Sequence, residues 1–116
     1  MHIERFEKNG RTSQAVVDGD TIYLSGQVAA NAEGEGARSQ TAQALAAIDA
    51  LLAQCGSSRS NVLRAIVYLA DRSDFDEMNA AWTDWVDGDN PPARATIQAT
   101  LLDPDWKVEI VATARR

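Results

Sequence analysis

Two short runs near the start of the chain have the residue types that favour β-strands. These β-prone runs, Ser13–Val17 and Thr21–Val28, flank the tripeptide Asp18-Gly19-Asp20. Because Asp-Gly tolerates the positive φ of a tight turn, the three segments together predict a β-hairpin. The next residues, Ala29 to Gly36, are small and polar and contain glycine, which is typical of a loop.

A helix is predicted from Ala37 to Gln54, where Ala, Gln and Leu dominate and neither Gly nor Pro occurs. Its apolar residues recur with a period of 3.6 and define one face: Ala44, Leu45, Ile48, Leu51 and Leu52. Gly56 lies just beyond the end of this stretch, where a glycine in the left-handed conformation commonly caps a helix.

A buried strand and a second helix follow. Val62–Ala70 is rich in β-branched and aromatic residues, as expected of a strand with little solvent contact. Ser73 is placed as a helix N-cap, since three acidic residues come directly after it in the first turn. The helix then carries large apolar residues at steps of three, four and three, namely Phe75, Met78, Trp82 and Trp85. This spacing favours core packing over a cofactor site.

The chain ends in two further strands after the helix-breaking segment Gly88–Pro92. Ala93–Leu101 alternates apolar and polar residues, and Lys107–Ala114 does the same with Glu109 between two apolar neighbours. The order ββ-α-β-α-ββ predicts an α+β fold, a mixed sheet with two helices packed on one face. The other sheet face also has apolar alternation, so we expect it to bury against neighbouring subunits.

The composition narrows the classes of function. The 116 residues are expected to form a single domain, residues 1–116, with a formal net charge of −6. An acidic chain is a poor nucleic-acid ligand, because that affinity comes from basic side chains that neutralise phosphates. One Cys and one His argue against an internal disulfide, a His-based metal site and a Ser-His-Asp triad. No long apolar segment occurs, so we expect a cytoplasmic protein without a membrane partner.

Two charged residues stand out as candidates for chemistry. Arg94 opens a strand directly after Pro91-Pro92, and its guanidinium fork can hold a small carboxylic acid. Glu109 lies in an apolar strand, where a carboxyl can move protons near neutral pH. The alternative is that the two form a structural ion pair or that each points to water. Cys55 has no His to generate a thiolate and is expected to be inert.

Several short motifs, in this order along the chain, resemble the Rid family of reactive-intermediate deaminases, also called YjgF-type proteins. They span nearly the whole chain: Ser13-Gln14-Ala15-Val16, Leu24-Ser25-Gly26-Gln27, Gln40-Thr41, Phe75 with Met78-Asn79, Pro91-Pro92-Ala93-Arg94 and Val108-Glu109-Ile110. The combination of the Pro-Pro-Ala-Arg and Val-Glu-Ile blocks is the specific part. Trp82, Trp85 and the run from Pro104 to Glu109 are most similar to the YoaB-like branch.

The resemblance implies a fold like the trimeric-barrel chorismate mutases, with three subunits around an axis and a cleft between neighbours. It implies hydrolysis of enamine or imine intermediates, such as 2-aminoacrylate or 2-iminopropanoate, to a 2-keto acid and ammonia without a cofactor. In the family, the residue matching Arg94 grips the substrate carboxylate and the residue matching Glu109 orients water or shuttles protons. Residues matching Ser25, Asn79 and Thr96 line the same cleft.

One position departs from the family pattern. Thr12 stands where typical members have a Tyr that closes the cleft, so substrate packing, rate or substrate identity can differ here. The second hypothesis is a non-catalytic module that binds keto acids or amino acids in the same cleft. Ribonuclease activity, a third hypothesis, is disfavoured by the acidic balance and by the lack of a His pair.

Overall fold

The computed structural model describes residues 2–116 of the chain and contains six strands and two α-helices within that range. In chain order they are β1 (Ile3–Lys8), β2 (Ser13–Asp18), β3 (Thr21–Leu24), α1 (Ala37–Gln54), β4 (Val62–Leu69), α2 (Phe75–Trp85), β5 (Ala93–Gln98) and β6 (Val108–Arg115). Short 3₁₀ turns precede β4 and α2.

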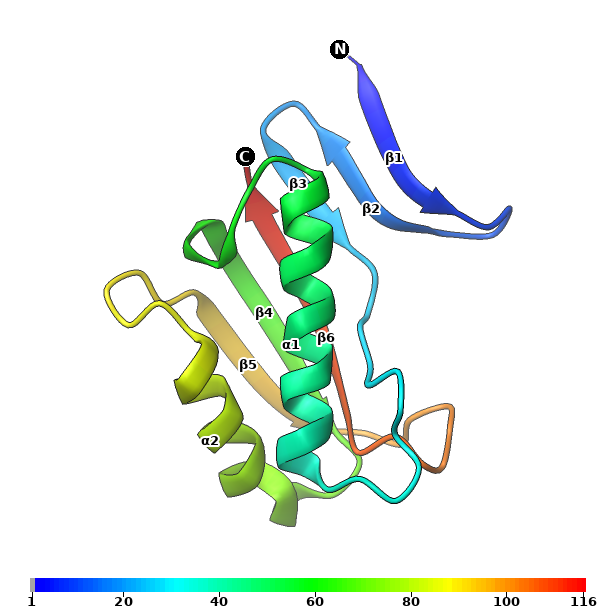
Figure 1. Cartoon of the computed structure of the whole chain (residues 1–116), viewed down its shortest axis with the longest axis vertical. Coiled ribbons are helices and arrows are strands. Elements are labelled where there is room, and N and C mark those ends of the chain that lie inside the picture. The colour runs from blue at the N-terminus through cyan, green and yellow to red at the C-terminus, as the bar shows by residue number, and fades with distance from the viewer. Residues whose placement is uncertain (1) are drawn as a thin grey trace.

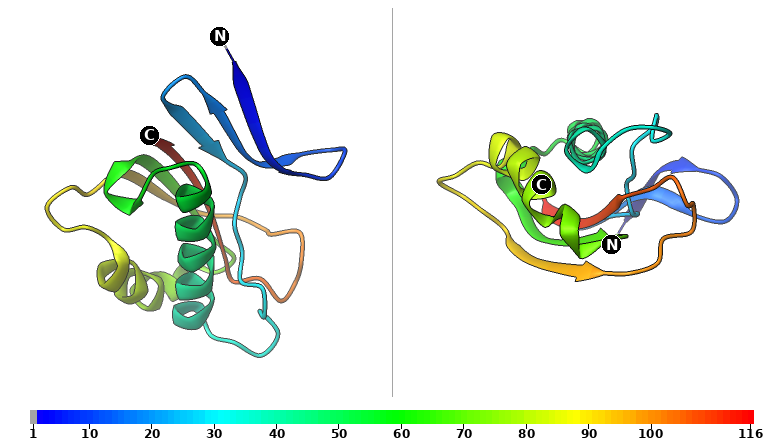
Figure 2. Two further views of the ribbon diagram at one scale, coloured as in Figure 1. Left: turned by 45° about the horizontal axis from the view of Figure 1, so that its top comes forward. Right: turned by 90° about the horizontal axis from the view of Figure 1, so that it is seen from below.

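The strands form one mixed sheet in the order β1-β2-β3-β6-β4-β5. All neighbouring strands are antiparallel except β4 and β5, which run parallel because α2 carries the chain back between them. Both helices cover the same face of this sheet, α1 over its middle and α2 beside it towards β5 (Figures 1 and 2). The predicted mixed α+β sheet with two helices on one face is confirmed.

The core lies between this sheet face and the helices. Its largest fully buried side chains come from both layers: Ile22, Leu45, Ile48, Leu52, Leu69, Met78 and Ile110. The apolar face predicted for α1 is buried as expected. Trp82 and Trp85 of α2 are also buried, with ring centroids 5.3 Å apart, whereas Phe75 at the start of α2 is 41% exposed. Its assignment to the buried stripe is therefore wrong.

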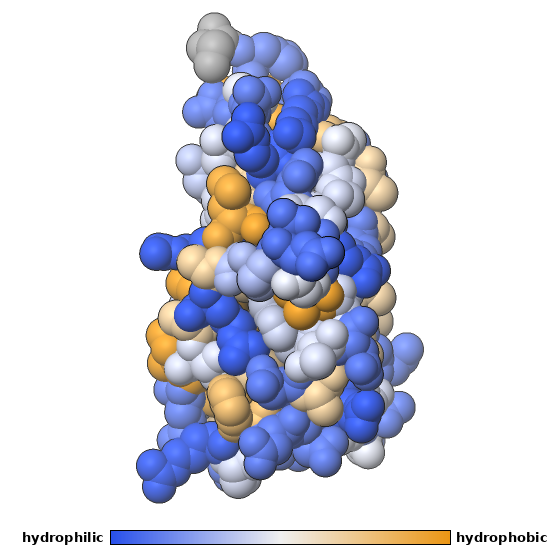
Figure 3. Space-filling view, turned by 90° about the vertical axis from the view of Figure 1, so that its left-hand side faces the viewer, coloured by the Kyte–Doolittle hydropathy of each residue, from blue (hydrophilic) through white to orange (hydrophobic). Residues whose placement is uncertain are grey.

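The opposite face of the sheet carries apolar side chains that no helix covers. Tyr23 of β3 is 51% exposed and Ile97 of β5 is 46% exposed. Ile66 and Tyr68 of β4 and Val111 of β6 lie between them and are partly buried. Figure 3 shows apolar side chains gathered along the left margin of the molecule, which is the side away from the helices. We call this side of the sheet the uncovered face; its apolar residues are Tyr23, Ile66, Tyr68, Ile97 and Val111.

β1 was not predicted from the sequence, because Ile3–Lys8 mixes charged and apolar residues without a regular alternation. It is an edge strand whose pairing with β2, from Ile3 opposite Asp18 to Lys8 opposite Ser13, supplies its order. Three predicted strands are also shorter at their C-terminal ends: β3 ends at Leu24, β4 at Leu69 and β5 at Gln98.

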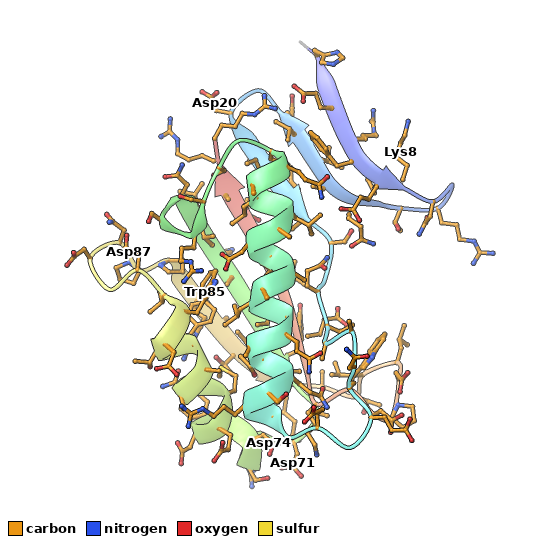
Figure 4. All side chains as sticks on the ribbon, in the orientation of Figure 1. Lys8, Asp20, Asp71, Asp74, Trp85 and Asp87 are labelled. Carbon is orange, nitrogen blue, oxygen red and sulfur yellow. The ribbon has the colours of Figure 1, made fainter. Side chains whose placement is uncertain are left out.

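The turns and caps follow the sequence signals with one exception. Gly19 in the hairpin turn and Gly56 after α1 both have positive φ, as predicted. Ser73 is not an N-cap. Instead the Asp71 side chain accepts a hydrogen bond from the Ser73 backbone N–H at 2.8 Å, at the turn that leads into α2. Figure 4 shows Asp71 and Asp74 together near this end of α2.

A search of residues 2–116 for a helix both long enough and apolar enough to cross a membrane finds none.

Candidate active site

The parallel pairing of β5 with β4 determines where Arg94 and Thr96 point. Arg94 lies opposite Ala65 and Thr96 opposite Val67, and both of these β4 residues are buried beneath the helices. Residues paired across neighbouring strands share a face, so Arg94 and Thr96 point towards the helical layer. Because β5 is the edge of the sheet beside α2, both side chains lie at the boundary between the core and solvent and are partly buried.

The Arg94 guanidinium is held by groups from α2. Its Nη1 donates a hydrogen bond of 2.8 Å to Oδ1 of Asn79. The guanidinium carbon lies 5.0 Å from the ring centroid of Trp82 and 5.9 Å from that of Phe75. Both distances are within the range of cation–π attraction. Aromatic faces and one amide oxygen therefore orient the cation without neutralising it.

No carboxylate within residues 2–116 forms an ion pair with Arg94. Neither Arg94 nor Glu109 takes part in any of the ion pairs found among residues 2–116. Burial lowers the pKa of the Arg94 guanidinium, because its charged form has lost part of its water without gaining a carboxylate. An anion placed on the free edge of the guanidinium would restore that lost solvation, and a planar carboxylate matches its two parallel N–H bonds.

Glu109 lies on the uncovered face of the sheet. It pairs with Tyr68 of β4, and its neighbours Val108 and Ile110 point into the core on the opposite side. The carboxylate packs directly on the backbone of Gly26, where a side chain would clash. A Cβ atom built on Gly26 would lie 2.9 Å from Cδ of Glu109 and would meet one carboxylate oxygen even more closely. Gly26 therefore leaves the space that the Glu109 carboxylate occupies.

Ser25 and Thr12 lie near the beginning of β2. The Ser25 hydroxyl donates a 2.6 Å hydrogen bond to the Ser13 carbonyl oxygen, and Ser25 directly precedes Gly26. Thr12 is exposed, and its hydroxyl lies 3.4 Å from Oδ1 of Asn9. Thr12 thus adds no aromatic cover to this end of the sheet.

Of the six residues expected at the site, five fall into two groups within one chain, and the sixth, Thr12, is exposed and belongs to neither. Arg94, Thr96 and Asn79 lie together between β5 and α2, whereas Glu109 and Ser25 lie around Gly26. Arg94 and Glu109 are on opposite faces, with β4 between their strands and their partners Ala65 and Tyr68 three residues apart. At about 3.3 Å per residue and 4.8 Å per strand, their backbones are roughly 10 Å apart in each direction. The alternative of a structural ion pair between them within one chain is wrong.

Two contributions to the site were not recognised from the sequence. The spacing of Trp82 indicated core packing, and it is buried, but its ring also faces the Arg94 cation. Gly26 occurs in the Ser-Gly-Gln run, yet its role depends on space next to a residue 83 positions away, which no local pattern reveals. Among residues 2–116, no three His, Cys, Asp or Glu side chains gather closely enough to hold a metal ion.

Comparison with known proteins places the chain in a family. The sequence model of the family described as endoribonuclease L-PSP matches residues 2–116. The RutC family protein YoaB of Escherichia coli is 43% identical over 114 residues, which are 98% of each chain. The chain belongs to this family. Its members carry the names RutC, YjgF and Rid, so the resemblance to the Rid family and its YoaB-like branch is confirmed.

Solved structures of the Rid family have the same fold. A YjgF family member from Neisseria meningitidis is 46% identical and superposes with a TM-score of 0.96 over 100% of this chain and 96% of its own. The Rid family protein YyfA from Yersinia pestis is 26% identical, with a TM-score of 0.91 over 99% of this chain and 100% of its own. Identity therefore ranges from 46% to 26% while the fold is retained.

Proposed function

We propose that this chain is a cofactor-independent deaminase that hydrolyses small 2-imino acids and their enamine tautomers to 2-keto acids and ammonia. The observation that carries the proposal is the partly buried Arg94 guanidinium, oriented by Asn79 and Trp82 and lacking a carboxylate partner among residues 2–116. Membership of the Rid family supports a deaminase-type role.

Arg94 binds the substrate through its carboxylate. Two parallel N–H···O bonds fix both the position and the plane of the acid, which orients the adjacent imine carbon. Thr96 is two residues further along β5 on the same face, so its hydroxyl lies where the imine group of a bound substrate would be. Asn79 keeps the guanidinium from rotating away, because its amide oxygen accepts from Nη1.

The reaction needs only water and proton transfers. A water oxygen attacks the electrophilic imine carbon, the C=N π electrons move to nitrogen, and the water loses a proton while nitrogen gains one. The resulting carbinolamine then expels ammonia as the C–O bond becomes a carbonyl, which gives the 2-keto acid. Glu109 holds the attacking water and accepts its proton, then returns a proton to the departing nitrogen. No redox step and no metal are required for this balance.

Glu109 reaches the substrate from a neighbouring copy of the chain. Within one chain it is on the wrong face of the sheet and too far from Arg94 to touch the same small molecule. The uncovered face, with Tyr23 and Ile97 about half exposed, gives the apolar surface that such an assembly would bury. A homotrimer in which sheets pack around an axis brings the β5 edge of one subunit to the uncovered face of the next.

The decisive experiment measures ammonia and keto-acid release from freshly generated 2-iminopropanoate. Arg94→Ala should lower kcat/KM by about 100-fold, since a charge-assisted bidentate contact contributes about 3 kcal/mol. Arg38→Ala is the matched control, because this exposed Arg pairs with Asp84 on the helical surface and should keep wild-type activity. Release by the wild-type protein no faster than in buffer would overturn the proposal.

A second candidate is a carboxylate-binding module without turnover. It is favoured by one observation: the groups that would bind the acid are assembled within one chain, whereas Glu109 is not beside them. In that case pyruvate binding, measured by calorimetry, is lost in Arg94→Ala while imine hydrolysis stays at the buffer rate. Sedimentation of the native protein as a monomer would also favour this candidate, because a monomer lacks the site that includes Glu109.

A further inference from the structure

A cavity of about 260 Å³ lies next to Thr96, at the end of β5 beyond Arg94. It is lined by Leu69, Arg72, Phe75, Thr96, Ile97 and Gln98. Two of these residues, Thr96 and Phe75, also belong to the group around Arg94 described above. Its lining residues come from the end of β4, from the turn and first residue that begin α2, and from β5.

The cavity adjoins the Arg94 site. The Phe75 ring, 5.9 Å from the Arg94 guanidinium carbon, is also a wall of the cavity. Thr96 is two residues, or roughly 7 Å, beyond Arg94 along the strand and faces the same side. A molecule whose carboxylate is on Arg94 and whose body follows β5 therefore passes Thr96 and places its far end in the cavity.

The walls of the cavity are mainly apolar. Leu69 forms its buried base, while Phe75 and Ile97 are 41% and 46% exposed. Ile97 belongs to the uncovered face and borders the cavity at the β5 edge of the sheet. The Gln98 side-chain oxygen is already engaged, because it accepts the Arg72 backbone N–H at 2.7 Å. The site thus joins a cation at one end to an apolar cavity at the other, which matches an amphipathic acid.

We infer that this cavity receives the side chain of the substrate, and that the protein prefers 2-imino acids with branched aliphatic side chains over 2-iminopropanoate. The part of this inference that concerns hydrolysis rests on the proposed function. The competing class is an imino acid with a carboxylate side chain, which the Arg72 guanidinium at the rim of the cavity would attract. The apolar class is favoured because three of the six lining residues, including the base, present only hydrocarbon.

The expected preference follows from the hydrophobic effect. Each buried methylene increases binding roughly four-fold, and an isobutyl side chain has three more carbons than a methyl side chain. Full burial would therefore give roughly 60-fold. Because the cavity is open on one side, we expect kcat/KM for the leucine-derived imine to exceed that for the alanine-derived imine by at least ten-fold.

The test compares imines generated fresh from alanine, leucine and glutamate by an amino acid oxidase, with keto-acid release as the readout. The leucine-derived imine should be hydrolysed with the highest kcat/KM. In Ile97→Ala the leucine-to-alanine ratio should fall at least five-fold while the protein sediments as the wild type does, a check that is needed because Ile97 also belongs to the uncovered face. In the matched control Leu63→Ala it should not change, since Leu63 is equally exposed but lies at the far end of β4. A wild-type ratio below three, or faster hydrolysis of the glutamate-derived imine, would overturn the inference.

A binding experiment separates this inference from the proposed function. If the cavity is the side-chain site, 4-methyl-2-oxopentanoate should bind at least ten-fold more tightly than pyruvate in calorimetry, and Ile97→Ala should remove the difference. Equal affinities would refute the cavity assignment even if imines are hydrolysed. Conversely, selective binding without any hydrolysis above the buffer rate would refute the deaminase proposal and leave the cavity assignment standing.

Discussion

Replacing Gly26 with Ala tests whether the position of the Glu109 carboxylate matters for turnover. A Cβ atom at residue 26 would be 2.9 Å from Cδ of Glu109 and closer still to one carboxylate oxygen. Ordinary carbon–carbon contacts are about 3.5–4.0 Å, so the carboxyl group must move by roughly 0.6–1 Å. Gly26 does not have a positive φ, so its backbone accepts Ala without strain. The protein should fold normally, because the clashing atoms are the free end of a flexible side chain.

A displacement of about 1 Å in a positioned catalytic group can cost roughly 100-fold in rate. We therefore expect Gly26→Ala to lower kcat for 2-iminopropanoate by ten- to a hundred-fold, with a smaller change in KM because Arg94 still holds the carboxylate. The assay is steady-state ammonia release at saturating and subsaturating substrate. Urea unfolding should give a free energy within about 1 kcal/mol of the wild type.

Two controls separate positioning from general damage. Gly88→Ala places the same methyl group in open space, without a positive φ, and should leave kcat unchanged. Glu109→Gln should lower kcat by itself, and adding Gly26→Ala to it should lower kcat by no more than a further two-fold, since both changes act on one group. A folded Gly26→Ala protein with wild-type kcat would show that the carboxylate position does not limit the reaction.

Two further predictions concern the scaffold. Gln40 is fully buried in α1, and the two N–H groups of its Nε2 are shared among the carbonyl oxygens of Ala32, Glu35 and Asp105 at 3.0–3.1 Å. Its Oε1 accepts the Lys107 backbone N–H at 2.9 Å. Gln40→Leu should therefore lower the free energy of unfolding, measured in urea, by about 3 kcal/mol. The control is Gln43→Leu, which removes exposed hydrogen bonds to Asn31 and should lower the same free energy by less than about 1 kcal/mol. Equal losses in the two variants would contradict the role of burial. Burial also raises the pKa of the Cys55 thiol, so at pH 8 its thiolate fraction is below that of a free cysteine. A disulfide reagent should therefore label Cys55 slowly in the native protein and fast in urea. Fast labelling of the native protein would contradict this prediction.

The sequence by itself was sufficient for most of the local structure. Composition and period located α1 to its observed bounds, and the glycines at positions 19 and 56 have the positive φ that their turns require. Such features depend on neighbours within a few residues, so a local pattern can report them. β1 was missed for the same reason: its order comes from pairing with β2, and its own residues have no strong alternation.

The candidate site, too, could be predicted only in part from the sequence. The Pro-Pro-Ala-Arg block and the strand alternation singled out Arg94 and Glu109, and placed Thr96 on the face of Arg94. Only the tertiary structure decided that Asn79 bonds to Arg94, that Gly26 makes room for Glu109, and that the two charged residues are on opposite faces of one sheet. The physical reason is that side-chain type and hydrophobic period are local properties of the sequence. The sheet face on which a side chain lies, its distance from other residues and the space around it depend on how strands far apart in the chain are paired.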